Sequence, residues 1–119
     1  MKVQVITDQD VVGFHNWPDA PEKVGFLAEY HRHIFRIRTG IDVGHDEREE
    51  EIFLVEARIA NYLEGAYDNV SGLGLDFGPS SCETIARGIL EHFIAGPYAI
   101  NMKWVEVLED GRGGARISL

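Results

Sequence analysis

Three of the five histidines occupy positions that could bring their imidazoles together. His31 and His33 are two residues apart in an alternating run from Tyr30 to Thr39, and residues i and i+2 of a strand project from the same side. His15 ends an earlier alternating run, and an antiparallel neighbour can supply a third imidazole from across a strand pair. Three neutral imidazoles with one vacant position form the ligand set of a catalytic zinc ion. The sequence therefore predicts a Zn²⁺ site made of His15, His31 and His33.

An alternative stays open for these histidines, because two histidines at this spacing also occur as an ordinary polar pair on a sheet surface. A closed structural zinc site would need a fourth protein ligand, and Cys82 has no partner cysteine and lies at a predicted helix start. His45 and His92 fall beside predicted helix ends, where we expect structural or solvent-facing roles. If a metal binds, the pattern favours an open site.

The elements that must position these residues are strands and two helices. Alternation of apolar and polar residues predicts strands over residues 2–16, 30–39, 102–109 and 115–119. The first of these is expected to be interrupted by a turn or bulge at Asp8–Asp10. Helical spacing of apolar residues predicts a first helix over about residues 46–64, opened by Asp46 and Glu49, and a second helix opened by a capping box of Ser80 and Glu83. The segments 17–28 and 65–79 are predicted to be irregular connections, rich in glycine and proline.

This order of strands and helices predicts an α+β fold, with an antiparallel four-stranded sheet and two helices on one face. A chain of 119 residues is expected to form one domain over residues 1–119. The packing leaves the other sheet face partly apolar and both sheet edges unpaired, which favours self-association. We therefore expect a homo-oligomer.

The charge balance restricts the class of partner. The chain has 11 Lys and Arg against 20 Asp and Glu, a formal net charge of −9, so its surface is expected to repel nucleic acid and anionic lipid. No segment approaches the roughly 20 apolar residues of a membrane span, and the first residues do not form a signal peptide. We expect a cytoplasmic protein with a small-molecule partner.

Four segments of the chain are similar to motifs of one known family. Val11–His15 resembles a first-strand motif that ends in a zinc histidine, and Tyr30–Phe35 resembles a His-Gly-His motif. Ser80–Ala86 is similar to the Pro-Thr-Ser-Glu-Asn run that opens a second helix, and Val107–Asp110 resembles a strand end carrying Lys-Glu-Thr. These motifs belong to the 6-pyruvoyl-tetrahydropterin synthase and 6-carboxy-tetrahydropterin synthase family, whose fold is called the T-fold. The resemblance covers most of the chain.

This resemblance implies roles for particular residues. It implies that the three histidines bind zinc and that Glu109 accepts hydrogen bonds from the 2-amino and ring N–H groups of a pterin or purine-like base. A carboxylate can accept two parallel N–H bonds from such an edge, as it does from arginine. A solvent-exposed hairpin position is the alternative for Glu109. The resemblance also implies a T-fold that assembles into an oligomeric β-barrel, with active sites at subunit interfaces.

The departures from the family concern proton transfer. Leu27 stands where the family has a cysteine, four residues before the first histidine of the pair, and Asp68-Asn69 matches an Asp-His pair. Some relatives that lack the cysteine are thought to use a glutamate of the same loop, which makes Glu29 a candidate acid/base, with Asp68 a second. Both could equally be ordinary surface residues.

The leading prediction is a zinc-dependent carbon–oxygen or carbon–carbon lyase that acts on a dihydropterin such as 7,8-dihydroneopterin triphosphate. Zinc would act as a Lewis acid on the side-chain hydroxyls. Arginines could bind the phosphate tail or form ion pairs between subunits; the candidates are Arg32, Arg36, Arg38 and Arg112. One alternative is a non-catalytic protein that binds a pterin or purine, which Leu27 and Asn69 favour. A second is a zinc hydratase or hydrolase on an unrelated fold.

Overall fold

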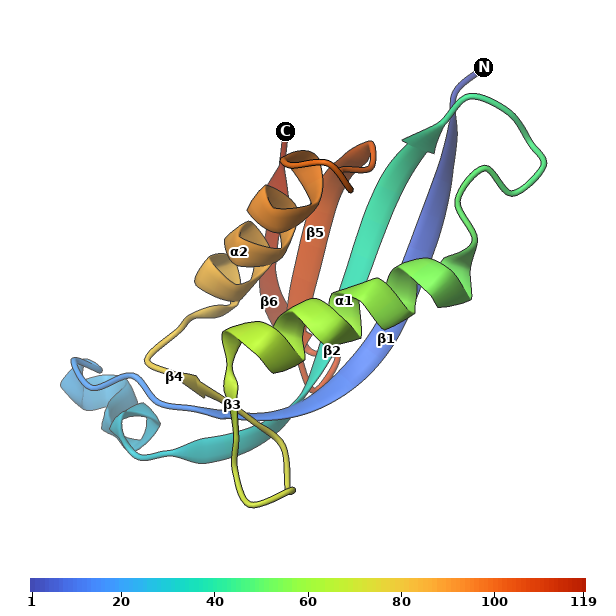
Figure 1. Ribbon diagram of the computed structural model, residues 1–119. Helices are drawn as coiled ribbons and strands as arrows, with labels where there is room; N and C mark the ends of the chain where they lie inside the picture. Colours follow the sequence, from blue (N-terminus) through green and yellow to red (C-terminus); the bar gives the residue numbers. More distant parts are fainter.

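The computed structural model describes residues 1–119, and its strands form one open sheet with helices on one side (Figure 1). In chain order the elements are β1 (Val3–His15), the 3-10 helix η1 (Glu22–Ala28), β2 (His31–Val43), α1 (Ile52–Ala66), β3 (Asp68–Asn69), β4 (Leu75–Gly78), α2 (Cys82–Ile94), β5 (Met102–Glu109) and β6 (Gly113–Ser118). The strand order is β3-β4-β1-β2-β5-β6. The predicted α+β class is confirmed.

The sheet has six strands, and the prediction of four was wrong. The predicted strands are β1, β2, β5 and β6, which pair antiparallel with one another in that order. The added strands β3 and β4 lie in the segment predicted as an irregular connection, and β4 runs parallel to β1 with Leu75 opposite Gly13. The sheet is therefore mixed. Strands of two and four residues are too short for alternation to reveal them in a sequence.

The first strand is continuous, so the predicted turn or bulge at Asp8–Asp10 was wrong. Asp8 and Asp10 point to the side of the sheet that the helices leave uncovered. Arg36 of β2 donates hydrogen bonds from Nε and Nη2 to the two carboxylate oxygens of Asp8, at 2.9 and 2.6 Å. A cation on the neighbouring strand makes a carboxylate acceptable within this strand.

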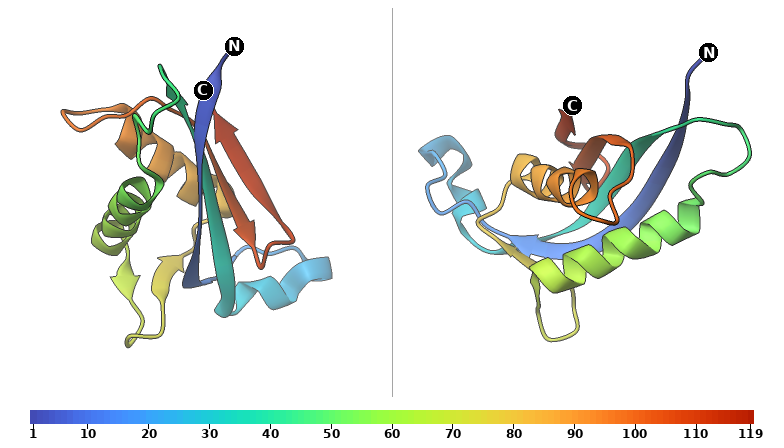
Figure 2. Two further views of the ribbon diagram at one scale, coloured as in Figure 1. Left: turned by 90° about the vertical axis from the view of Figure 1, so that its right-hand side faces the viewer. Right: turned by 45° about the horizontal axis from the view of Figure 1, so that its top comes forward.

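The two α-helices cover the same side of the sheet, as predicted (Figure 2). α2 packs on β5 and β6, and α1 packs on β1. The segment predicted as the loop 17–28 contains η1, which has no buried residue. No helix in the structure combines the length and apolar character needed to cross a membrane.

Both helix starts differ from those predicted from the sequence. α1 begins at Ile52, later than the predicted start at Asp46, because the Glu51 carboxylate accepts hydrogen bonds from the first free backbone N–H groups of the helix. α2 is capped by Ser81, whose hydroxyl accepts a hydrogen bond from the N–H of Thr84 at 3.2 Å. The predicted capping box of Ser80 and Glu83 does not form, since the N–H of Ser80 donates to the Phe77 carbonyl. The helix hydrogen bonds begin at the Ser81 carbonyl, which accepts from the N–H of Ile85, so the Ser80 carbonyl is free for another partner.

The core fills the space between the helices and the sheet. Phe35 and Ile37 of β2 are fully buried in it, together with apolar side chains from both helices and from β5. The alternation that directs these two residues inward also directs His31 and His33 to the helix side, at the start of the same strand. The fold therefore places the predicted metal ligands at one end of its core.

The opposite side of the sheet carries apolar side chains and a network of charges. Glu106 of β5 accepts hydrogen bonds from Arg38 and Arg116, and the guanidinium of Arg116 lies 4.1 Å from the centre of the Trp104 ring. Burial raises the pKa of Glu106, but the hydrogen bonds and the charges of Arg116 and Arg38 together lower it further, so the pKa of this carboxyl is below its ordinary value. These arginines are thus engaged on the side of the sheet that faces away from the histidines.

Candidate metal centre

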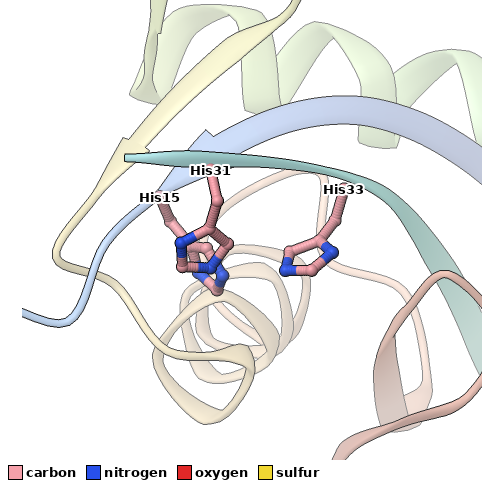
Figure 3. A group of neighbouring side chains, drawn as sticks. All are labelled: His15, His31 and His33. Carbon is pink, nitrogen blue, oxygen red and sulfur yellow. The ribbon is translucent and has the colours of Figure 1, made fainter. Parts of the chain in front are cut away.

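The structure brings the three predicted histidines together at the end of the β1–β2 pair (Figure 3). His15 lies opposite His31 in the antiparallel register, and Gly13 lies opposite His33. The ring centroid of His15 is 4.6 Å from that of His31 and 5.3 Å from that of His33, and the centroids of His31 and His33 are 4.8 Å apart. One potential ligand atom from each histidine lies within 4.8 Å of the others.

Each of the three imidazoles has its Nδ1 atom occupied by an acceptor. His15 Nδ1 lies 3.0 Å from the Ser80 carbonyl oxygen, His31 Nδ1 lies 2.8 Å from the Glu29 carbonyl oxygen, and His33 Nδ1 lies 2.6 Å from Asp110 Oδ2. Carbonyl and carboxylate oxygens cannot donate, so each Nδ1 carries the proton and donates it. Each neutral ring then has its lone pair on Nε2. Fixing the tautomer in this way is the usual task of the groups behind metal-binding histidines.

The Nε2 atom of His33 lacks the partner that a buried nitrogen atom normally has. His33 Nε2 is buried and makes no hydrogen bond in the structure. Burial lowers the pKa of His15, an effect that outweighs the Ser80 carbonyl and the charge of Glu109, which raise it; the neutral form is the one that binds a metal. An orphaned nitrogen beside two further imidazoles fits a metal ion that prefers nitrogen ligands, as zinc does.

The histidines open into a cavity of about 730 Å³, which is within the range of small-molecule sites. Its lining comes from β1, η1, β2, the start of α2 and the β5–β6 hairpin. Three carboxylates line it, those of Glu83, Glu109 and Asp110, whereas Arg112 is the single arginine and there is no lysine. The cavity is therefore acidic, and we expect it to prefer a neutral ligand or one with N–H donors.

Glu109 projects into this cavity beside Cys82. The Sγ atom of Cys82 donates a hydrogen bond to Glu109 Oε1 at 3.6 Å. Burial of Cys82, reinforced by the charge of Glu109, raises the pKa of its thiol to about 12. A thiol with this pKa remains protonated at neutral pH, a form that donates a weak hydrogen bond and is a poor nucleophile.

The other predicted site residues do not line the cavity. Arg32 lies on the strand face opposite to that of His31 and His33. Glu29 contributes its backbone carbonyl to His31, but its carboxylate is not part of the lining, and Asp68 is exposed on the short strand β3. The cavity of a single chain therefore contains neither predicted acid/base carboxylate. Leu27 does line it.

The two remaining histidines have local roles, as expected. His45 Nδ1 accepts a hydrogen bond from the N–H of Glu47 at 3.1 Å, and the His92 ring lies against that of Tyr62 with centroids 4.4 Å apart. Asn69 accepts a hydrogen bond from the N–H of Gly72 and so holds the turn between β3 and β4.

Sequence reasoning missed the role of Asp110. This residue follows the last residue of β5 and opens the turn to β6 with a positive φ of 53°, followed by Gly111 at 68°. Oδ1 accepts a hydrogen bond from the N–H of Ile34 at 2.8 Å, while Oδ2 accepts one from Nδ1 of His33. One carboxylate therefore connects the turn to the backbone of β2 and to one of the predicted metal-binding histidines. The Asp-Gly pair indicated a hairpin turn, but not what its carboxylate would touch.

A scan against models of protein families finds no match to this chain, and a search of curated proteins finds none.

Proposed function

We propose that the protein is a zinc-dependent lyase with a T-fold, of the 6-pyruvoyl/6-carboxy-tetrahydropterin synthase type, that acts on a dihydropterin. One observation carries the proposal: three imidazoles with fixed Nδ1 protons turn their Nε2 atoms into a cavity that also contains the carboxylate of Glu109. The motif resemblance supports the same assignment, since it matches His15, His31, His33 and Glu109 to zinc ligands and to a pterin-binding glutamate.

The residues of the chain divide the work of binding and orientation. His15, His31 and His33 would hold zinc, which when bound supplies Lewis-acid chemistry at the hydroxyl groups of the substrate side chain. Glu109 accepts hydrogen bonds from the amino and ring N–H groups of the pterin, in the two-point geometry that a carboxylate offers. Because Glu109 lies beside the histidines, one pterin could place its ring at Glu109 and its side chain at the histidines.

The charges in the cavity favour a substrate without phosphate. Arg36 is paired with Asp8, and Arg38 with Glu106, on the far side of the sheet, so neither is available to a ligand beside the histidines. Arg112 is the one arginine of the cavity lining and there is no lysine, against three acidic residues. With Zn²⁺ bound, the charges of Glu83, Glu109, Asp110, Arg112 and the metal sum to about zero, so the cavity offers no excess of positive charge to a triphosphate. The hydroxylated side chain of 7,8-dihydroneopterin is uncharged and needs none. We therefore propose the unphosphorylated dihydropterin as the preferred substrate.

Proton transfer by Glu29 or Asp68 would require a second subunit. Glu29 and Asp68 lie outside the cavity of their own chain, so they can serve as acid/base groups only where subunits meet. The open sheet supports assembly, because its edge strands β3 and β6 each leave one side unpaired. The proposal therefore includes a homo-oligomer with active sites at its interfaces.

One observation favours a second candidate, a non-catalytic protein that binds a pterin or purine. The cavity has an apolar Leu27 where catalysis in the family relies on a cysteine, and neither predicted acid/base carboxylate reaches it. Such a protein would keep the metal and Glu109 for binding.

Product analysis separates these candidates. The zinc-loaded protein is incubated with 7,8-dihydroneopterin and, separately, with its triphosphate, and products are identified by mass spectrometry, while binding is followed by pterin fluorescence. A lyase releases a shortened or dehydrated pterin, and replacement of His31 by alanine abolishes this product. Binding without turnover supports the second candidate, and absence of pterin binding to zinc-loaded protein overturns both.

A further inference from the structure

The carboxylate of Glu109 lies at the point toward which the histidines turn. Its Oε1 atom is 3.1 Å from His15 Nε2, and its Oε2 atom is 3.5 Å from His33 Nε2. The side chain is only one-third exposed, at 33%, and the two histidines are exposed by 10% and 19%. Two nitrogen and two oxygen atoms thus face one another at the inner end of the cavity.

When the rings of His15 and His33 are neutral, no proton lies between their Nε2 atoms and the carboxylate oxygens of Glu109. The Nδ1 atoms of both histidines donate to Ser80 and Asp110, so each Nε2 carries a lone pair. A lone pair that faces a carboxylate oxygen at these distances is repelled by it. A cation shared by the nitrogen and oxygen atoms turns this repulsion into attraction.

The two distances, which also suit an ion pair with a protonated histidine, are compatible with atoms that share a tetrahedral metal ion. Zinc binds imidazole nitrogen and carboxylate oxygen at about 2.0–2.2 Å, and the corners of a tetrahedron of this size are about 3.3 Å apart. The measured separations of 3.1 and 3.5 Å lie on either side of that value. Glu83, which also lines the cavity, makes no comparable approach to a histidine.

We propose that Glu109 is the fourth ligand of the metal ion in the substrate-free protein, and that it leaves the metal when the substrate arrives. The first part rests on the metal centre alone. The second part rests on the proposed function, because it is the amino and ring N–H groups of the pterin that draw the carboxylate away. The resting site is then closed, and substrate binding opens the fourth position.

The local structure allows this exchange without movement of the backbone. Glu109 is the last residue of β5 and is held between Phe35 of β2 and Gly113 of β6 in the sheet register. The thiol of Cys82 is the one hydrogen-bond donor to its carboxylate. A single weak donor restrains the side chain little, so rotation of the side chain is sufficient to move the carboxylate from the metal toward a ligand.

Metal affinity of matched variants tests the first part. Zinc dissociation constants are measured by competition with a chromophoric chelator for the full chain, for Glu109→Gln and for Glu83→Gln, with circular dichroism to verify folding. Both variants lose one cavity carboxylate, but only Glu109 faces the histidines. Loss of a residue that only hydrogen-bonds to a metal ligand typically weakens metal binding by about 10-fold to 100-fold. We expect Glu109→Gln to weaken zinc binding by at least about 10-fold, and Glu83→Gln to change it by less than about threefold.

The visible spectrum of the cobalt-loaded protein gives a second measurement that does not depend on affinity. We expect azide to leave the spectrum of the full chain unchanged, because Glu109 fills the fourth position, and to alter the spectrum of Glu109→Gln. Addition of 7,8-dihydroneopterin to the full chain should change the spectrum.

The outcomes separate the two proposals. Equal zinc affinity in both variants, or azide binding to the unchanged chain, overturns Glu109 as a ligand while the pterin function stands. If Glu109→Gln loses zinc affinity but the cobalt spectrum of the full chain does not respond to the pterin, Glu109 is supported as the fourth metal ligand and its displacement by substrate is overturned. If fluorescence also detects no pterin binding, the proposed function is overturned as well. A protein that takes up no stoichiometric metal overturns the whole centre.

Discussion

Replacement of Asp110 by asparagine tests whether the turn after β5 supports the metal centre. The Asp110 carboxylate accepts two hydrogen bonds, from His33 Nδ1 at 2.6 Å and from the N–H of Ile34 at 2.8 Å. Asparagine has nearly the same shape and tolerates the positive φ of 53° at this position. It offers one amide oxygen, so one of the two hydrogen bonds must be lost.

The expected magnitude follows from which hydrogen bond is lost. If the amide oxygen stays on Ile34, the amide N–H₂ group faces the Nδ1–H group of His33, and the ring loses its acceptor and its fixed tautomer. Loss of such a partner typically weakens metal binding by about 10-fold to 100-fold. The Asp110 side chain is 46% exposed, so water replaces part of the lost interaction, and we expect a change of about 10-fold.

The assay is the zinc dissociation constant of Asp110→Asn, measured by chelator competition beside that of Asp8→Asn. The control variant loses the same negative charge, from the far side of the sheet, where Asp8 pairs with Arg36. We expect the control to bind zinc as the unchanged chain does.

Two results would refute this reasoning. A folded Asp110→Asn protein that binds zinc within about twofold of the unchanged chain would show that the hydrogen bond to His33 does not support the metal centre. An equal loss in Asp8→Asn would assign the effect to net charge instead of to the turn.

Four further predictions concern stability. The hydrogen bond from Arg36 lowers the pKa of Asp8, and the pKa of Glu106 is also below its ordinary value. Both carboxyl groups therefore stabilise the fold at pH values above their ordinary pKa values of 3.8 and 4.5, and we expect the melting temperature to fall as the pH drops through and below these values. A melting temperature that does not depend on pH would contradict this. Gly40→Ala should destabilise the protein by about 1–3 kcal/mol in urea unfolding, because a Cβ atom there would lie 2.0 Å from Trp104 Nε1. Gly65→Ala is the opposite case, a helical glycine with open space around it, and should stabilise by about 0.5 kcal/mol in the same assay. Zinc at 100 times its dissociation constant should stabilise the folded protein by about 2.7 kcal/mol, and calorimetry that detects no shift would argue against binding to the native state.

The sequence was sufficient for the parts of the site that depend on strand geometry. His31 and His33 share a face because successive residues of a strand alternate, and His15 meets them because β1 and β2 are antiparallel neighbours. The α+β class followed in the same way from the periods of apolar residues. In each case a local pattern determines the geometry, with one assumption about which strands pair.

The remaining parts depend on contacts between distant segments, which no local pattern encodes. Cys82 and Glu109 meet because α2 lies across the end of β5, and Asp110 reaches His33 because the hairpin folds back on β2. The turn expected at Asp8–Asp10 fails for a similar reason. Acidic residues indicate a turn when they are considered alone, but Arg36 on the adjacent strand stabilises one of them within a sheet.

The surroundings of the histidines also explain why a small sheet can hold three imidazoles in one place. Their Nδ1 partners come from three separate segments: the loop before β2 supplies Glu29, the start of α2 supplies Ser80, and the β5–β6 turn supplies Asp110. Each ring is therefore held by a different part of the fold, so the cluster forms only when all of these parts have assembled. A metal bound there would connect both central strands to the helix and the hairpin. Its binding energy would stabilise the whole sheet and not only one loop, because the unfolded chain cannot present the same set of ligands.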